Sequence, residues 1–249
     1  MKTLTFAARN TKEILRDPLN MLFGLGFPLV LLLLLSAIQA NSPVALFELQ
    51  HLTPGITVFG LSFMTLFSAT VIAKDRCGSL LQRLYTTPMT PWDFILGYTL
   101  PIVPIAVVQC VICYIVAVAL GLRATLNILY ALVFFIPAAV LYIALGLLCG
   151  SVLTDKQVGG ICGALLTNLS AWLSGVWFDL DLVGGVFKKL SYMLPFVHAV
   201  EMERTALAGD LTEAFLHLRW VIGYAFVVLL SAILLFLRQM RGAVSLSAL

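Results

Sequence analysis

Charged side chains are scarce in this sequence of 249 residues, since Asp, Glu, Lys and Arg together make up only 11% of it. About a quarter of the residues of a soluble globular protein are charged. This chain therefore has too few polar groups to cover a surface that faces water. The scarcity excludes an ordinary soluble domain, and we expect no nucleic-acid partner.

The missing charges leave six long apolar runs. A helix needs roughly 20 residues to cross a hydrocarbon layer of about 30 Å, and its backbone must satisfy its own hydrogen bonds there. We therefore predict an all-α polytopic membrane protein whose residues 1–249 form a single transmembrane domain. The six predicted transmembrane helices are residues 20–40, 54–73, 94–120, 127–150, 158–178 and 220–238.

Metal-ligating residues are also few. The histidines are His51, His198 and His217, and no His-Glu-x-x-His motif occurs, which argues against a membrane-embedded metallohydrolase. We interpret His198 and Glu201, one helical turn apart, as an interfacial pair. We expect no metal site.

The five cysteines give no sign of a disulfide framework. None falls in a segment that we place outside the cell, and Cys110-x-x-Cys113 lacks partner ligands nearby. We interpret these two as small apolar residues on a helix face.

Two further motifs are missing. No G-x-x-x-x-G-K-[ST] sequence is present to hold nucleotide phosphates. The six predicted spans hold no ionisable group except at their edges, whereas ion-coupled carriers usually need one at membrane depth. Both absences restrict the energy sources that this chain can use by itself.

The distribution of Lys and Arg predicts the orientation, because positive charge gathers on the cytoplasmic side. Six spans place both termini on one side, which we predict to be cytoplasmic at the cell inner (plasma) membrane. That side collects Lys2, Arg9, Lys12, Arg16, Lys74, Arg76, Arg83, Lys156, Arg238 and Arg241. The opposite side has Arg123, Lys188, Lys189, Arg204 and Arg219.

Residues 3–16 have the pattern of an amphipathic helix. Leu4, Ala7, Ala8, Thr11, Ile14 and Leu15 share one face, with Phe6 off that face, and the basic residues Arg9, Lys12 and Arg16 lie opposite. We predict an interfacial helix beside anionic lipid headgroups. A cleaved signal peptide ending at residues 37–40 is the alternative, which the acidic residues Glu13 and Asp17 disfavour.

A polar segment, residues 74–92, separates the second and third spans. Leu80, Leu81 and Leu84 recur in it at helical spacing, and Thr87-Pro88 ends the helical pattern. We predict a short amphipathic helix on the cytoplasmic side. It either lies on the membrane or docks a cytoplasmic partner.

The segment 179–219 precedes the last span and is predicted to be external. Residues 190–200 hold no Asp, Glu, Lys or Arg, which is too short a run to span a bilayer but long enough to enter it and return. Gly209 breaks this first helix, and Asp210 caps a second one. We predict two short re-entrant or surface helices here.

The polar segment resembles the cytoplasmic loop of permease subunits of ABC type-2 exporters. The matching residues are Asp75, Arg76, Gly78, Ser79, Leu80, Arg83, Leu84, Thr87, Pro88 and Gly97. Arg16-Asp17-Pro18 is similar to the N-terminal elbow of the family. Pro195, Glu201 and Arg204 are similar to its re-entrant region. Asp75, Gln82 and Tyr98 depart from the residues that are most usual in the family.

The resemblance implies a transport subunit that is not an enzyme and binds no cofactor, with ATP and Mg bound by a separate ABC ATPase. It further implies that Asp75, Arg76, Gly78, Leu80, Leu81, Arg83, Leu84, Thr87 and Pro88 couple to that ATPase. In this interpretation the leucines seat in a groove of the ATPase and the charges pair at its rim. A second permease copy or paralogue completes the dimer, and lipids surround it.

The substrate is less constrained. Polar residues within the predicted spans include Gln109, Thr167, Asn168 and Ser170, which either line a substrate pathway or, as we favour, form hydrogen bonds between helices. The apolar interior favours export of a drug, toxin or lipid-like molecule. Export of a polysaccharide or glycolipid, or ion-coupled transport, are the alternatives.

Overall fold

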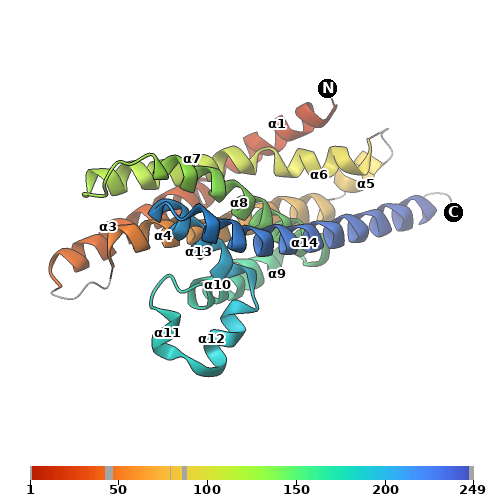
Figure 1. Ribbon diagram of the computed structural model, residues 1–249. Coiled ribbons are helices and arrows are strands. Elements are labelled where there is room, and N and C mark those ends of the chain that lie inside the picture. Colours follow the sequence, from red (N-terminus) through yellow and green to blue (C-terminus); the bar gives the residue numbers. More distant parts are fainter. Residues whose placement is uncertain (1, 43–46, 79, 86–88, 247–249) are drawn as a thin grey trace.

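The computed structural model describes residues 2–42, 47–78, 80–85 and 89–246, without the side chains of residues 82, 83, 85, 91 and 240–246. The described part is helical and contains no strand (Figure 1). This confirms the predicted all-α fold class.

Five stretches are long and apolar enough to cross a membrane: Pro18–Ala40, Leu49–Cys77, Trp92–Ala119, Asn127–Val152 and Leu211–Gln239. They correspond to five of the six predicted spans. The remaining stretch is helical through α9 (Asp155–Val158), η2 (Gly159–Leu166) and α10 (Thr167–Leu173). It begins with three polar residues, which lower its hydropathy, so the count of six stays a prediction.

The N-terminal part begins with α1 (Lys2–Leu15), and Asp17 starts the next helix by accepting a hydrogen bond from Asn20 N at 3.2 Å. Pro18 occupies the first helical turn, where its missing N–H costs nothing. The first long stretch then runs through α2 (Pro18–Met21), η1 (Leu22–Gly26) and α3 (Phe27–Ala40). The wider π-helical turn of η1 directly precedes α3, which has Pro28 in its first turn.

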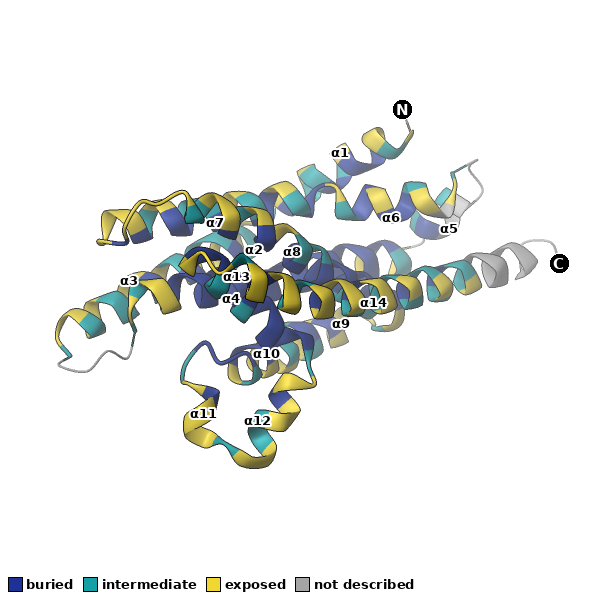
Figure 2. Cartoon of the chain, viewed as in Figure 1, coloured by how far each residue is buried: buried dark blue, intermediate teal, exposed yellow. Residues whose placement is uncertain are grey.

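Helix α4 (Leu49–Cys77) occupies the centre of the bundle and is mostly buried, as Figure 2 shows. It packs most closely on α8 (Asn127–Val152), where a Cβ on Gly146 would lie 2.6 Å from Thr65 O. A Cβ on Gly150 would lie 2.8 Å from Ala69 O. Small residues of this kind allow membrane helices to approach closely, so these glycines set the α4–α8 separation.

The third long stretch is preceded by α5 (Leu80–Tyr85) and consists of α6 (Pro91–Thr99) and α7 (Ile102–Ala119). Thr90 caps α6 in a reciprocal box with Asp93. In Figure 1, α1, α5, α6 and the last turns of the C-terminal helix gather toward one end of the bundle. We refer to this as the α1 end.

The region before the last long stretch differs from the prediction. It contains α11 (Leu180–Val183), α12 (Gly185–Tyr192) and α13 (Pro195–Ala208), and Gly209 at φ 90° ends α13. The cap at Asp210 is confirmed, because Asp210 Oδ1 accepts from Glu213 N at 3.1 Å. The helix that it caps is not a separate surface helix, since α14 (Leu211–Leu246) runs on without a break.

Helix α13 does not lie on the surface of the protein. Its face formed by Phe196, Ala199, Val200 and Leu207 is buried against α4, α8 and α14. By contrast, the outer faces of α3 and α14 expose large apolar side chains (Figure 2). Such faces suit contact with lipid or with another membrane chain.

Candidate coupling site

The residue at the centre of the candidate coupling site is Asp75, near the end of α4, whose side chain is 3% exposed. Arg9 of α1 donates hydrogen bonds to both of its carboxylate oxygens, with Nη1 2.6 Å from Oδ2 and Nη2 2.8 Å from Oδ1. Such bidentate pairs combine charge attraction with fixed geometry. Burial by itself lowers the pKa of the Arg9 guanidinium, but the hydrogen bonds and charge of Asp75, with Glu13, raise it.

Helix α6 also contributes to the contacts around Asp75, which we call the charged joint. Tyr98 donates a hydrogen bond to Asp75 Oδ2 at 2.9 Å, and Asn10 Nδ2 donates to Gly97 O at 3.0 Å. The ring of Phe6 packs edge-on against Tyr98, with centroids 5.0 Å apart. A Cβ on Gly97 would overlap that ring. A larger residue at position 97 would therefore force the Phe6 ring, and α1 with it, to move.

Arg76 holds α4 to a second neighbour. Its guanidinium donates to the backbone carbonyls of Ser151 and Leu153, just where α8 ends. Gln239 of α14 also donates to Ser151 O. Asp75 and Arg76 of the predicted coupling motif therefore attach the α1 end of α4 to the rest of this chain.

The leucines of α5 turn inward, which corrects the predicted docking mode. Leu81 is 1% exposed and belongs to the core of this chain. Leu84 is half-buried and packs on the same core, and Leu80 is also half-buried. Helix α5 contacts α4 and α14, so Leu81 is not exposed to seat in a groove of a partner in this arrangement, and the coupling role of the segment stays a prediction.

Of the remaining predicted coupling residues, only Gly78 is fully described. Gly78 is exposed and ends α4, its N–H donating to Lys74 O at 2.8 Å. Thr87, Pro88 and the side chain of Arg83 lie outside the described residues.

Helix α1 packs against the bundle through a face that includes Ala7 and Ile14 of the predicted apolar face, and also Phe6, which the prediction placed off it. Phe6, Ala7, Asn10 and Ile14 are its buried residues, whereas Leu4 is 67% exposed. Arg9 pairs with Asp75 and Glu13, and it cannot serve mainly as a headgroup ligand as predicted. Lys12 and Arg16 are exposed along an open groove of about 600 Å³. These two remain available to lipids.

The predicted re-entrant residues meet near the opposite end of α4. Pro195 occupies the first turn of α13. Arg204 Nη1 donates to Glu201 Oε1 at 2.8 Å, Nε donates to His51 O at 3.1 Å, and Nη2 donates to Gly175 O at 3.0 Å. Arg204 thus ties α13 to α4 and to the turn after α10. Glu201 pairs with Arg204, and not with His198 as we had interpreted it.

The four candidate pathway residues do not gather into one site. Thr167 and Asn168 donate to carbonyls of their own helical stretch, at Cys162 and Ala164. Ser170 forms a hydrogen bond of 2.6 Å with Tyr142 of α8. Gln109 is 1% exposed, and its Nε2 lies 3.4 Å from Thr57 O of α4. Ser170 and Gln109 therefore join helices, while Thr167 and Asn168 do not.

Comparison with known proteins identifies the family. The sequence model of the ABC-2 type transporter family matches residues 1–207. This chain belongs to the ABC-2 type transporter family. The chain is also 23% identical, over 214 residues, to nodulation protein J of Rhizobium meliloti strain 1021, covering 86% of this chain and 80% of the relative. Nodulation protein J of Sinorhizobium fredii NGR234 is 22% identical over 193 residues, covering 78% and 72%.

One polar cluster of this ABC-2 protein was missed from the sequence. Glu203 of α13 is fully buried, and Tyr114 of α7 donates to its Oε1 at 2.8 Å. Thr57 Oγ1 of α4 lies 2.9 Å from both carboxyl oxygens, and Cys110 Sγ lies 3.8 Å from Oε1. A signal was available: Glu203 is three or four positions from apolar residues on both sides (Ala199, Val200, Ala206, Leu207), which places it on the apolar face.

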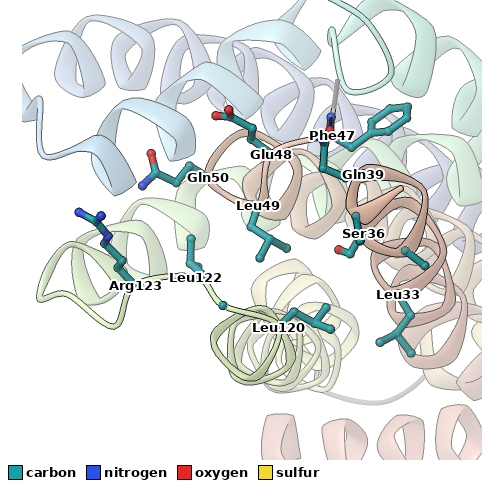
Figure 3. A pocket seen from close by; sticks show the side chains of 13 residues that line it. Leu33, Ser36, Gln39, Phe47, Glu48, Leu49, Gln50, Leu120, Leu122 and Arg123 are labelled. Atoms are coloured by element: carbon teal, nitrogen blue, oxygen red, sulfur yellow. Dashed lines mark hydrogen bonds between the residues drawn. The ribbon is translucent and has the colours of Figure 1, made fainter. Parts of the chain in front are cut away.

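The ABC-2 protein also has a cavity of about 750 Å³ where α3 ends, α4 begins and α7 ends (Figure 3). Figure 3 shows Leu33, Leu49 and Leu120 around it, with Glu48 and Arg123 at its polar side. The Ser36 hydroxyl beside it has no hydrogen-bond partner in the described part of the chain. Apolar walls with a few polar groups at one side suit an amphipathic molecule.

Proposed function

We propose that this chain is the membrane permease subunit of an ATP-driven exporter whose ATPase is a separate polypeptide. The family match over residues 1–207 carries this proposal. The α1 end, including residues 74–92 and both termini, then faces the cytoplasm, as the Lys and Arg distribution favours. The ATPase binds ATP and Mg, and this chain supplies the pathway.

Force from the ATPase enters through the exposed residues around the end of α4. Leu81 and Leu84 pack inward, so the contact surface is instead Lys74, Cys77, Gly78, Thr90 and Trp92, all of which are exposed. Asp75 and Arg76 transmit the movement, because they join this end of α4 to α1, α6 and α8. Rigid-body motion of packed helices is a common form of such transitions.

The exporter works as a dimer with a second copy or a paralogue. The apolar outer faces of α3 and α14 offer surface both for a second permease and for lipid. Closure of two ATPases on ATP then brings two coupling ends together and shifts the spans between inward- and outward-facing states.

The substrate is hydrophobic or amphipathic, in keeping with the apolar cavity beside Leu33 and Leu120. Drugs, toxins and lipid-like molecules fit this description, and so do glycolipids or lipid-linked polysaccharides. The two relatives are named nodulation proteins and give no support to drug efflux in particular.

An ion-coupled carrier is the alternative, and Glu203 favours it. Ionisable groups within apolar helix packing often mark ion pathways, and Glu203 is buried in α13, outside the six spans in which we predicted none. Transport in ATP-free vesicles driven by a proton gradient alone would support this alternative and would contradict the ATP-driven function.

The test uses Cys77, an exposed cysteine at the proposed contact surface. In sealed vesicles, a membrane-impermeant maleimide should label Cys77 only from the cytoplasmic side, and bound ATPase should slow that labelling severalfold. Cys77→Ser is the control for background from the half-buried Cys149. Equal labelling with and without a co-purifying ATPase, together with unchanged ATP turnover, would refute the proposed contact.

A further inference from the structure

Glu203 is an acidic residue that is buried without a basic partner in the described part of the chain. Its side chain is fully buried between α4, α7 and α13. Its side-chain oxygens contact hydroxyl and thiol groups, and no ion pair joins it to a basic residue within the described part of the chain. A carboxylate buried without a cation is strongly disfavoured relative to the neutral acid. Asp75, at the other end of α4, does have a cation.

The hydrogen bonds around Glu203 are best satisfied by the protonated acid. Thr57 has one hydroxyl hydrogen, but its Oγ1 lies 2.9 Å from Glu203 Oε2 and 2.8 Å from Pro54 O. If Oε2 carries a proton, it donates to Thr57 Oγ1, and Thr57 donates to Pro54 O. Oε1 then accepts from Tyr114. Each polar atom in this chain of contacts has a partner.

We propose that Glu203 is a proton-binding site, occupied in the closed arrangement of the helices and emptied when α13 separates from α4 and α7. The occupied state follows from the cluster itself. The link to opening rests on the proposed function.

The neighbouring titratable and charged groups are engaged elsewhere or exposed. On α13, Arg204 pairs with Glu201, and His198 contacts His217 of α14 and Tyr192 O. Arg219 and Glu213 of α14 are exposed, and α8 carries no Asp, Glu, Lys, Arg or His. On α7 the titratable neighbours are Tyr114, Cys110 and Cys113, and α4 contributes the uncharged hydroxyl group of Thr57. Nothing described near Glu203 supplies a compensating positive charge.

The proton step balances with water alone. When the helices separate, water reaches Glu203, the Oε2–H bond breaks, and the proton passes to a water molecule while the electron pair stays on the carboxylate. On closure the carboxylate takes a proton back from water. Acid on the side proposed as external therefore favours the closed arrangement.

The occupied state is tested by infrared spectroscopy of the purified full-length chain at neutral pH, without any ATPase. The wild-type protein should show a protonated-carboxyl C=O band that Glu203→Gln lacks and that Tyr114→Phe shifts, because one hydrogen bond to Oε1 is lost. Glu203→Gln is suited as a comparison, since its amide can donate to Thr57 and accept from Tyr114. A difference spectrum that shows carboxylate bands instead would overturn the proposal.

The link to opening is tested in the complex with its ATPase. Turnover of the wild-type complex should fall severalfold as the external pH is lowered, whereas the Glu203→Gln complex should lose that dependence. An unchanged pH profile in the variant would overturn the link. A chain that binds no ATPase would contradict the proposed function alone, because the infrared result still decides whether Glu203 holds a proton.

Discussion

Two acidic side chains are buried beside α4: Asp75 near the end of α4 itself, and Glu203 of α13, which contacts Thr57 of α4. Their surroundings differ in one respect. Asp75 is held by the guanidinium of Arg9 and by Tyr98, whereas Glu203 is held by Thr57, Tyr114 and Cys110. The first is a charged joint that fastens helices together, and the second is a neutral cluster. A buried carboxyl can therefore serve as a fixed anchor or as a group that changes charge, depending on whether a cation accompanies it.

The largest effect is expected from removing the cation at the charged joint. Arg9→Ala leaves Asp75 buried without its counter-charge, which should lower the free energy of unfolding by about 2–4 kcal/mol, a range reduced because Arg9 is partly exposed. Denaturation in detergent measures it. Adding Asp75→Asn to Arg9→Ala should restore much of the loss, because the unpaired charge is gone. No recovery in the double variant would contradict the account.

The next effect concerns the contact of α1 with α6. In Gly97→Ala the new Cβ overlaps the Phe6 ring, and such overpacking typically costs about 1–3 kcal/mol. Gly223→Ala in α14 is the matched control, since nothing lies within 4 Å of its Cβ position. Thermal unfolding of the two variants should separate them clearly. Equal melting temperatures would show that α1 shifts freely on α6.

The two acids themselves give a direct contrast. Glu203→Gln should change stability by less than about 1 kcal/mol, because a neutral group replaces a neutral acid and its hydrogen bonds persist. Asp75→Asn should cost more, since it removes the partner of Arg9. A larger loss of stability in Glu203→Gln than in Asp75→Asn, measured in the same unfolding assay, would contradict this account of the two acids.

The smallest effect is a pH dependence at the junction of α13 and α14. Burial lowers the pKa of His198, partly opposed by its hydrogen bond to Tyr192 O and reinforced by His217. The folded protein thus favours neutral His198, so this contribution is complete above the ordinary histidine pKa and is lost as pH falls from there through the lower pKa of the folded state. His198→Gln should flatten the decline in melting temperature on acidification. An equal decline in both proteins would assign it to other groups.

Features that depend only on residues close together in the sequence could be predicted from it. The apolar runs predicted six spans, of which five appear as long apolar helical stretches, and Gly209-Asp210 marked a helix boundary that the structure confirms. Capping and turn preferences act within a few residues, so a local pattern is enough to reveal them.

The site could not be predicted in the same way. Asp75 and Arg9 are distant in sequence, and their pairing depends on how α1 packs. The apolar face of α5 was recognised, but periodicity cannot say whether Leu81 meets a partner or its own bundle. For α1, apolar residues can face either protein or hydrocarbon, so the pattern identified an apolar face but did not show that Phe6 packs against the bundle while Leu4 is exposed.

Helix α4 runs from Leu49 to Cys77 without interruption and contributes to both the charged joint and the neutral cluster. A rod of this kind makes events on the two membrane faces thermodynamically interdependent. If docking of an ATPase at one extremity alters how firmly cargo or a proton is held near the other, then that occupant must alter the affinity for the ATPase by the same factor.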